Sequence, residues 1–307
     1  METQTITPER LEASVISVPP LARTTGGEIS LSENRKIVNH LKKGGVTTFL
    51  YGGNAALYHL SSREFQVLLE MMPQFGSDDC MMIPSVGPLY GTMMDQAKVL
   101  RELDFPTAML LPTRDMVTSA GIVEGIRRFV DSMGKPVVLY LKHEGYIEVK
   151  DTAKLMEEGC LSWIKYAIVR KDPSMDPFLR ELVQTLGSDR IVSGMGEQPA
   201  PVHMKQFNLK SYTSGCVCVA PGLSMDMLQA LQMDDMTKAE DIRKQFEGLE
   251  GLRNEINPVR VLHAAVRLTQ LANTGPIQPM ISEITDSQAA KVAKAAMELL
   301  QVESDRS

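Results

Sequence analysis

The chain has 307 residues, of which 43% are hydrophobic and 23% are charged, and its formal net charge is -6. This composition is typical of a globular protein and excludes a disordered or collagen-like chain. The acidic balance excludes a whole-molecule attraction to nucleic acid or to anionic membranes. No apolar run approaches the roughly 20 residues of a membrane helix, and no secretory signal is visible, so we expect a cytoplasmic protein.

The predicted elements alternate between short apolar runs and segments of helical period. The runs are apolar throughout, which is typical of parallel strands buried on both faces. Eight such runs, each followed by a helical segment, predict a (β/α)8 TIM barrel. A doubly wound open sheet is the alternative, but no glycine-rich dinucleotide loop follows the first run. The runs cover residues 14–18, 46–51, 80–86, 107–111, 136–141, 161–169, 190–194 and 213–221.

Serine residues mark two of the predicted helix starts. Ser30 or Ser32 can cap the helix after the first run. In the segment 61–64, a capping serine precedes Glu64, which is the pattern of a capping box.

The last quarter of the chain has a helical pattern without strand signals. Pro258 stands at a helix start, where its missing N–H costs nothing. We therefore divide the chain into a barrel over residues 1–233 and a C-terminal helical appendage over residues 234–307, packed on the barrel.

The four cysteines show no disulfide framework. Cys216 and Cys218 lie in an apolar run that we interpret as the interior of the eighth strand, with buried thiols rather than metal ligands. The histidines show no metal-ligand spacing, so no metal site is predicted. The cysteines are Cys80, Cys160, Cys216 and Cys218.

A lysine lies inside the sixth run, and barrel active sites lie at the C-terminal ends of strands. Lys165 is flanked by apolar residues, where a charged amine is costly to bury. Its pKa should fall, and the free amine can then attack a carbonyl to form a Schiff base. The alternative is a lysine that extends to the strand end or pairs with a carboxylate.

Tyr140 lies in the fifth run. A phenol at a barrel mouth can pass a proton to a carbinolamine or to a leaving alkoxide. The alternative is a core tyrosine whose hydroxyl is bound by the backbone. Lys142 shares a face with Tyr140 by strand alternation, and is a rival for the amine role or an anion contact.

Gly52, Gly53 and Asn54 follow the second run. Glycines there leave backbone N–H groups uncovered, which suits a carboxylate ligand. An ordinary tight turn is the alternative interpretation.

Further polar residues follow the fourth and fifth runs. Arg114 can hold a substrate acid in bidentate fashion, or pair on the surface with Asp115 or Glu124. His59 and His143 lie near strand ends and can line a pocket.

Taken together, these residues resemble the dihydrodipicolinate synthase and N-acetylneuraminate lyase family of class I aldolases. The shared order is a glycine-rich turn after the second strand, a tyrosine in the fifth, a lysine in the sixth and Gly194 after the seventh. A Gly-Cys-Val-Cys-Val stretch begins at Gly215, and the flanking segments 17–21, 257–268 and 275–280 agree. The resemblance spans nearly the whole chain.

The resemblance implies that Lys165 forms a Schiff base with pyruvate or another 2-oxo acid and that Tyr140 moves protons near the imine. It places the substrate carboxylate at Gly53 and Asn54, and the imine pocket beside Val217. No metal or organic cofactor is implied, since the lysine imine itself is the electron sink. A homo-oligomer, tetramer or dimer, is implied as well.

The chain also departs from the family pattern. Gly53 and Asn54 replace both hydroxyl residues of the carboxylate motif. The segment 112–114 lacks the tyrosine that neighbouring synthase subunits exchange. No arginine follows Tyr140 by about five residues, where the synthases bind the carboxylate of the aldehyde.

We therefore expect a Schiff-base lyase or dehydratase that acts on pyruvate or a related 2-oxo sugar acid, with no nucleic acid or membrane partner. One alternative is dihydrodipicolinate synthase itself, which condenses pyruvate with aspartate semialdehyde. Another is a catalytically silent relative that binds 2-oxo acids. The distal part of the substrate is expected to contact Arg114, Lys142 and His143.

Overall fold

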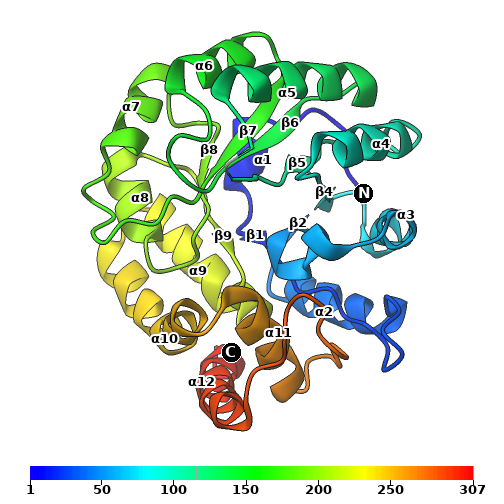
Figure 1. Ribbon diagram of the computed structural model, residues 1–307. Helices are drawn as coiled ribbons and strands as arrows, with labels where there is room; N and C mark the ends of the chain where they lie inside the picture. Colours follow the sequence, from blue (N-terminus) through cyan, green and yellow to red (C-terminus); the bar gives the residue numbers. More distant parts are fainter. Residues whose placement is uncertain (115, 307) are drawn as a thin grey trace.

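Short parallel strands form a ring at the centre of the molecule, and helices surround it (Figure 1). The computed structural model describes residues 1–114 and 116–306. All strand pairs within its sheets are parallel. The strands are β1 (Ile16–Ser17), β2 (Thr48–Leu50), β3 (Met81–Ile83), β4 (Ser85–Val86), β5 (Met109–Leu110), β6 (Val137–Leu141), β7 (Leu161–Tyr166), β8 (Ile191–Ser193) and β9 (Thr213–Ser214).

The strands close into one ring. One sheet has the order β3-β2-β1-β9, and the other has the order β4-β5-β6-β7-β8. β3 and β4 are separated only by Pro84, which has no N–H to donate to a ladder. A parallel bridge from Ser193 to Tyr212 joins β8 to β9. The eight predicted runs thus occupy eight strand positions, and the predicted TIM barrel with C-terminal helices is confirmed.

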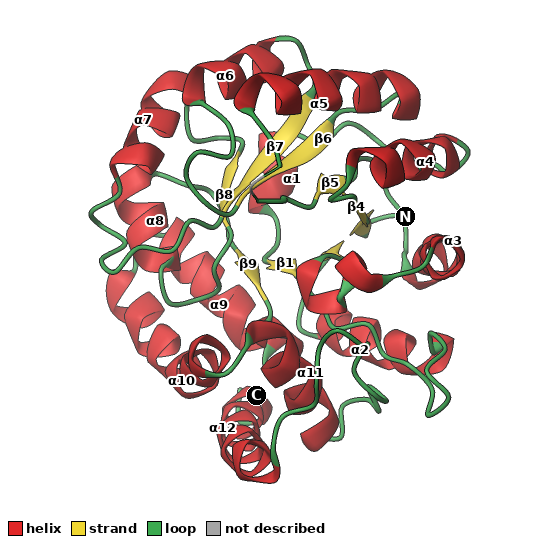
Figure 2. Ribbon diagram, viewed as in Figure 1, coloured by secondary structure: helices red, strands yellow, loops and turns green. Residues whose placement is uncertain are grey.

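Helices follow the strands and form an outer layer, drawn red around the yellow strands in Figure 2. None of the described helices is both long and apolar enough to cross a membrane. The helices are α1 (Pro8–Glu12), α2 (Leu31–Lys43), α3 (Ser62–Met71), α4 (Tyr90–Arg101), α5 (Ser119–Met133), α6 (Val149–Glu157), α7 (Pro177–Leu186), α8 (Ala200–Phe207), α9 (Pro221–Gln232), α10 (Met236–Glu255), α11 (Pro258–Leu268) and α12 (Asp286–Ser304).

The predicted helix caps are present. Ser30 caps α2, where its side chain accepts a hydrogen bond from the N–H of Glu33 at 3.4 Å. Ser61 and Glu64 form a complete capping box at the start of α3. Each cap satisfies N–H groups that have no partner within the helix.

The C-terminal helices lie against the barrel at the bottom of Figure 1, in orange and red. α11 begins at Pro258, as predicted. The carboxylate of Glu303 on α12 accepts hydrogen bonds from the N–H groups of Gly222 (2.9 Å) and Leu223 (2.8 Å) in the first turn of α9. These helices are thereby tied to the barrel by polar contacts as well as by apolar packing.

The prediction that Cys216 and Cys218 lie inside the eighth strand is wrong. β9 ends at Ser214, and residues Cys216–Cys218 form a short 3-10 helix. Ser214 Oγ accepts from the N–H of Val217 at 3.0 Å, which turns the chain as soon as the strand ends. An apolar run is compatible with a buried turn as well as with a strand, so the pattern could not separate the two. Both thiols are free and buried.

Candidate active site

Lys165 and Tyr140 are direct neighbours on adjacent strands. The register of β6 and β7 pairs Tyr140 with Lys165, and paired residues of parallel strands point to the same face. The Lys165 Nζ atom lies 4.8 Å from the centre of the Tyr140 ring. The structure therefore brings together the two residues that the sequence assigned to imine formation and proton transfer.

The space for the Lys165 side chain depends on a glycine at the end of the next strand. A Cβ atom built on Gly194 would lie 3.0 Å from Lys165 Cγ and only 2.7 Å from the carbonyl oxygen of Tyr166. Because the carbonyl belongs to a strand, it cannot move aside easily. Gly194 is thus required for β7 and β8 to approach each other where Lys165 lies.

The Lys165 amine is buried, with 5% of the residue exposed. Burial, followed by the positive charges of Arg253 and Lys142, lowers the pKa of this amine from 10.5 to about 7. The charged groups that act on it are therefore cations, which argues against a lysine paired with a carboxylate. At neutral pH a large fraction of the amine is unprotonated and nucleophilic.

The phenol of Tyr140 has the opposite shift. Burial raises its pKa above the ordinary value of 10, with a smaller contribution from the phenol of Tyr58, while Arg253 acts in the other direction. Tyr140 therefore keeps its proton at neutral pH and can donate it.

The glycine-rich turn after β2 consists of two short 3-10 helices, Gly53–Ala55 and Leu57–His59. The carbonyl oxygen of Gly52 accepts from the N–H groups of Ala55 (3.1 Å) and Leu57 (3.4 Å), which closes the turn. The Asn54 Nδ2 atom donates to the carbonyl oxygen of Val18 at 3.0 Å. One N–H of the Asn54 amide is therefore engaged by the backbone, and its second N–H is available for another acceptor.

Val217 is fully buried in the turn that follows β9. Gly215, two residues before Val217, has no side chain, and a Cβ built there would lie 3.0 Å from Asn54 Nδ2. The end of β9 and the turn after β2 are therefore in contact, as expected for neighbours on either side of β1.

Arg114, Lys142 and His143 follow β5 and β6 and lie farther out. Lys142 and Arg114 are exposed. The pKa of the Lys142 amine is nevertheless lowered, first by partial loss of hydration and then by the positive charge of Arg114. His143 Nε2 lies 3.2 Å from the carbonyl oxygen of Thr113, which links the two loops. Glu124 pairs with Arg128 at 2.7 Å. The suggested partner Asp115 lies outside the described residues.

Two residues near the site were missed by the sequence analysis. Tyr58 lies in the turn after β2, and a Cβ built on Gly53 would be 3.8 Å from its ring; burial raises the Tyr58 pKa to about 12. Arg253 comes from α10, and its side chain is 13% exposed. The position of Tyr58, a few residues after the glycine-rich turn, could have indicated it as a site residue. Nothing in the sequence around Arg253 indicated a role in the site.

Two glutamates are buried together beside Arg253. The carboxylate of Glu197 accepts from Ser214 Oγ at 2.8 Å and from Ser224 Oγ at 2.7 Å. Glu250 Oε1 accepts from the N–H of Glu197 at 3.1 Å. Burial, followed by the charge of Glu197, raises the pKa of Glu250 well above its usual value. Two adjacent buried carboxylates cannot both ionise readily, so the pair of Glu197 and Glu250 holds a proton to a higher pH than an exposed carboxyl group does.

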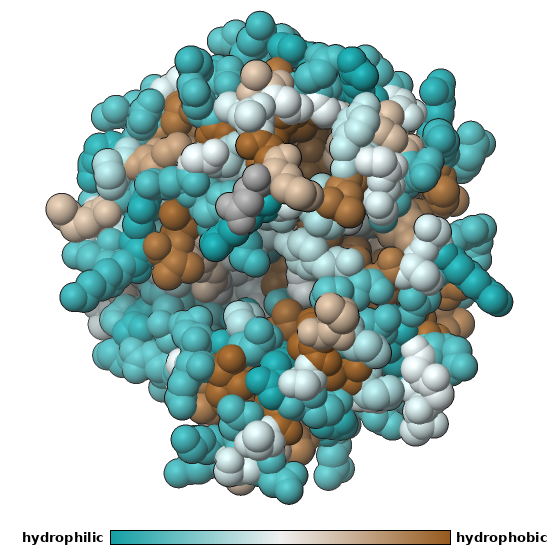
Figure 3. Space-filling model, viewed as in Figure 1, coloured by the Kyte–Doolittle hydropathy of each residue, from teal (hydrophilic) through white to brown (hydrophobic). Residues whose placement is uncertain are grey.

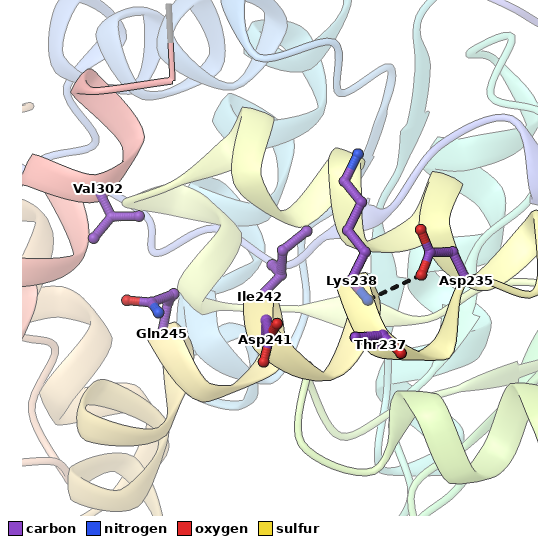
Figure 4. A pocket seen from close by; sticks show the side chains of 7 residues that line it. All are labelled: Asp235, Thr237, Lys238, Asp241, Ile242, Gln245 and Val302. Atoms are coloured by element: carbon purple, nitrogen blue, oxygen red, sulfur yellow. Dashed lines mark hydrogen bonds between the residues drawn. The ribbon is translucent and has the colours of Figure 1, made fainter.

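The outer surface of α10 has a separate hollow of about 550 Å³. Figure 4 shows its lining side chains, which come from Asp235, from the first half of α10 and from Val302 of α12. Asp235 belongs to this lining and also caps α10, where it accepts from the N–H of Lys238 at 3.0 Å. None of the lining residues belongs to the group around Lys165.

On the face seen in Figure 3, apolar side chains appear in several separate groups between polar ones.

No protein-family model matches the chain, and no curated protein sequence matches it either. Solved structures do match. Dihydrodipicolinate synthase from Bacillus clausii has a TM-score of 0.83 and 21% identity over 94% of this chain and 98% of its own. The synthase from Oceanobacillus iheyensis has a TM-score of 0.81 and 20% identity over 96% and 98%. The sialic acid aldolase of Ruminococcus gnavus has a TM-score of 0.81 and 15% identity over 95% and 99%.

The chain has the fold of the dihydrodipicolinate synthase and N-acetylneuraminate lyase family. The coverage is nearly complete in both directions, so the shared fold includes the C-terminal helices as well as the barrel. The resemblance inferred from the sequence is thus confirmed at the level of the fold.

Proposed function

We propose that this chain is a class I lyase in which Lys165 forms a Schiff base with pyruvate or a related 2-oxo acid. The observation that carries the proposal is the buried Lys165 amine, with a pKa lowered to about 7, beside the Tyr140 phenol. An amine with this pKa is a competent nucleophile at neutral pH. The barrel fold, shared with the synthases and the sialic acid aldolase, supports a lyase of this class.

The proposed reaction begins when the Lys165 nitrogen attacks the ketone carbon of the substrate. The resulting carbinolamine loses its hydroxyl group as water, and Tyr140 donates the proton that this departure needs. The protonated imine then accepts the electron pair of a bond at an adjacent carbon. Cleavage of a C–C bond at that carbon leaves an enamine and releases an aldehyde, which is an aldol cleavage. Removal of a proton from that carbon also leaves an enamine, which can expel the hydroxyl group of the next carbon as water, and this is a dehydration.

The remaining site residues are assigned to substrate recognition. In the proposal, Gly53 and Asn54 hold the carboxylate next to the ketone. Val217 forms the apolar wall of the imine pocket. The distal part of the substrate is contacted by the outer residues Arg114, Lys142 and His143.

Borohydride trapping tests the proposal. We expect incubation with pyruvate, reduction and peptide mass spectrometry to find the adduct on Lys165. Its yield should rise with pH through about 7, as the amine loses its proton. Lys165→Ala should abolish the adduct, while Lys142→Ala, which removes the rival amine, should retain it. An adduct on Lys142, or no adduct with pyruvate or longer 2-oxo acids, would refute the assignment.

Two alternatives are separated by turnover assays. The loss of both hydroxyl groups at Gly53 and Asn54 favours a catalytically silent relative, which would form the imine without releasing a product. Dihydrodipicolinate synthase activity is tested directly with pyruvate and aspartate semialdehyde.

The oligomeric state and the location remain proposals. Several apolar side chains are exposed in the segments that follow β4, β5 and β7, which supports the expected homo-oligomer, and sedimentation velocity would give its mass. A cytoplasmic location stays a prediction of the sequence. The exposed side chains are Leu89, Met116, Val169 and Met175.

A further inference from the structure

The Arg253 guanidinium is buried with too few partners for its five N–H groups. Its Nη1 atom lies 4.0 Å from Cys216 Sγ, a weak acceptor, and 3.6 Å from Glu250 Oε1. Its Nε atom is buried and has no hydrogen-bond partner within residues 1–114 and 116–306. Buried charged donors are normally satisfied, and a guanidinium fits a carboxylate through two parallel hydrogen bonds. The unfilled donors of Arg253 therefore indicate a site for an anion.

A second donor reaches the same place from the other end of the chain. A Cβ built on Gly215 would lie 3.0 Å from Asn54 Nδ2 and 3.2 Å from Arg253 Cζ. The amide and the guanidinium therefore both lie against Gly215 at the end of β9 and are close to each other. Because Gly215 has no side chain, it places no atom between the two donors, whereas any larger residue would place its Cβ there.

The acid nearest to Arg253 makes its hydrogen bonds elsewhere. Glu250 has a pKa raised well above its usual value by burial and by Glu197. Its two oxygen atoms already accept from the backbone N–H groups of Glu197 and Gln198, at 3.1 and 2.9 Å. Glu250 is thus engaged by the backbone, and at 3.6 Å its Oε1 atom lies beyond hydrogen-bond distance of Arg253 Nη1.

The guanidinium is also close enough to act on the reacting amine. It is the second cause, after burial, of the lowered pKa of Lys165, and it acts on Tyr140 as well. In a 2-oxo acid the carboxylate is bonded directly to the ketone carbon that becomes the imine carbon. The anion site and the amine must therefore be near neighbours. Arg114 and Lys142, in contrast to Arg253, are exposed.

We propose that Arg253, together with the Asn54 amide, binds the carboxylate of the 2-oxo acid, in place of the two hydroxyl groups that this chain lacks. The inference rests on the proposed function, since the ligand is its substrate. It makes Arg253, a residue of the C-terminal helices, a determinant of specificity for acids over neutral ketones.

The test compares pyruvate with pyruvamide, which has the same ketone but no negative charge. The concentration dependence of the trapped Lys165 adduct is measured at pH 9 for the full-length wild type and for Arg253→Met. At this pH most of the amine is unprotonated, so a change in its pKa has little effect. We expect Arg253→Met to raise the half-saturating pyruvate concentration about 10- to 100-fold, the loss of a charge-assisted interaction. The value for pyruvamide should change less than about threefold.

Two further variants control the comparison. Arg253→Lys retains the positive charge and should restore part of the preference for pyruvate. Arg243→Met removes an arginine from the same helix that is paired with Glu240 and Glu247, at 2.6 and 2.7 Å, and should leave both ligands unaffected. Equal effects of Arg253→Met on the two ligands, or none on either, would overturn the assignment.

Failure of the proposed function is distinguishable from failure of this inference. If the wild type forms no adduct with either ligand, the Schiff-base proposal fails. Calorimetric titration with pyruvate then decides the anion site separately. Binding by the wild type that Arg253→Met weakens at least tenfold would support the site, and no binding, or equal binding by both, would overturn it.

Discussion

The burial of Lys165 has an energetic cost that depends on pH. The pKa of its amine is about 7 in the folded protein, against roughly 10.4 in an unfolded chain. Below pH 7 the amine is protonated in both states, so the folded state carries the full cost of a buried cation. Between pH 7 and about 10 the folded state has released the proton and the unfolded state has not. The cost therefore declines as the pH rises.

We accordingly predict that Lys165→Met stabilises the protein, and more so at low pH. The gain in the free energy of unfolding should be on the order of a few kcal/mol at pH 6 and should shrink toward pH 10. Urea denaturation of both proteins at pH 6, 8 and 10 measures it. Lys98→Met, at a side chain that is 72% exposed, should show no such trend. A gain for Lys165→Met that stays constant with pH would contradict the lowered pKa.

At the residue scale, the sequence identified the groups that strands carry and missed the one that a distant helix supplies. Lys165 and Tyr140 could be predicted because a polar residue in an apolar strand must point toward the barrel mouth or be strongly perturbed. Arg253 follows Glu250 by three residues, a spacing that is typical of a solvent-exposed ion pair on a helix. Only the packing of α10 against the end of β9 places its guanidinium beside Gly215.

Among the elements, the turn after β2 is held in place by the cap of the helix that follows it. Ser61 Oγ accepts from the N–H of Glu64 at 3.2 Å, and Glu64 accepts in return from the N–H of Ser61 at 3.0 Å. Glu64 also pairs at 2.6 Å with Arg23, which is buried. The turn that carries Gly53 therefore ends at a fixed point.

Two adjacent serines allow the contribution of this cap to be measured. Ser61→Ala removes the side-chain acceptor at the N-cap and should lower the free energy of unfolding by about 0.5–2 kcal/mol. Ser62→Ala changes the first helical residue, which is exposed, and should have little effect. Thermal and urea unfolding of both variants provide the comparison. Equal losses in the two would mean that α3 starts elsewhere.

The order and number of strands could be predicted because each apolar run must be buried. Their lengths could not. The run 213–221 contributes only Thr213 and Ser214 to β9, since Ser214 Oγ binds the N–H of Val217 and starts a turn. The run 80–86 is divided at Pro84 into β3 and β4. These boundaries are set by a hydrogen bond that Ser214 makes and by one that Pro84 cannot donate, and hydropathy reports neither.

Over the whole molecule, the candidate site is assembled from both ends of the chain. Asn54 comes from the second βα unit, Lys165 from the middle of the barrel and Arg253 from the C-terminal helices. A division into a barrel and an appended helical region therefore describes the sequence pattern, while the proposed substrate site extends across the boundary. The helices can supply Arg253 only if they remain fixed on the barrel.

The contact between α12 and α9 provides a test of that coupling. Glu303 accepts from the N–H groups of Gly222 and Leu223, at 2.9 and 2.8 Å. Glu303→Ala leaves both donors without this partner and should cost about 1–3 kcal/mol. Trp163, the only tryptophan, is fully buried in β7 and reports on the barrel through its fluorescence. Far-ultraviolet circular dichroism, in contrast, reports on all the helices.

If the helices and the barrel unfold as one unit, Glu303→Ala should shift the fluorescence and dichroism transitions to lower urea concentration by the same amount. Glu298→Ala, on the same helix but with a side chain that is 67% exposed, should shift neither. A dichroism transition that moves to lower urea while the Trp163 transition stays in place would mean that the C-terminal helices detach first. The site would then lose Arg253 before the barrel unfolds, and adduct formation with pyruvate should decline with dichroism rather than with fluorescence.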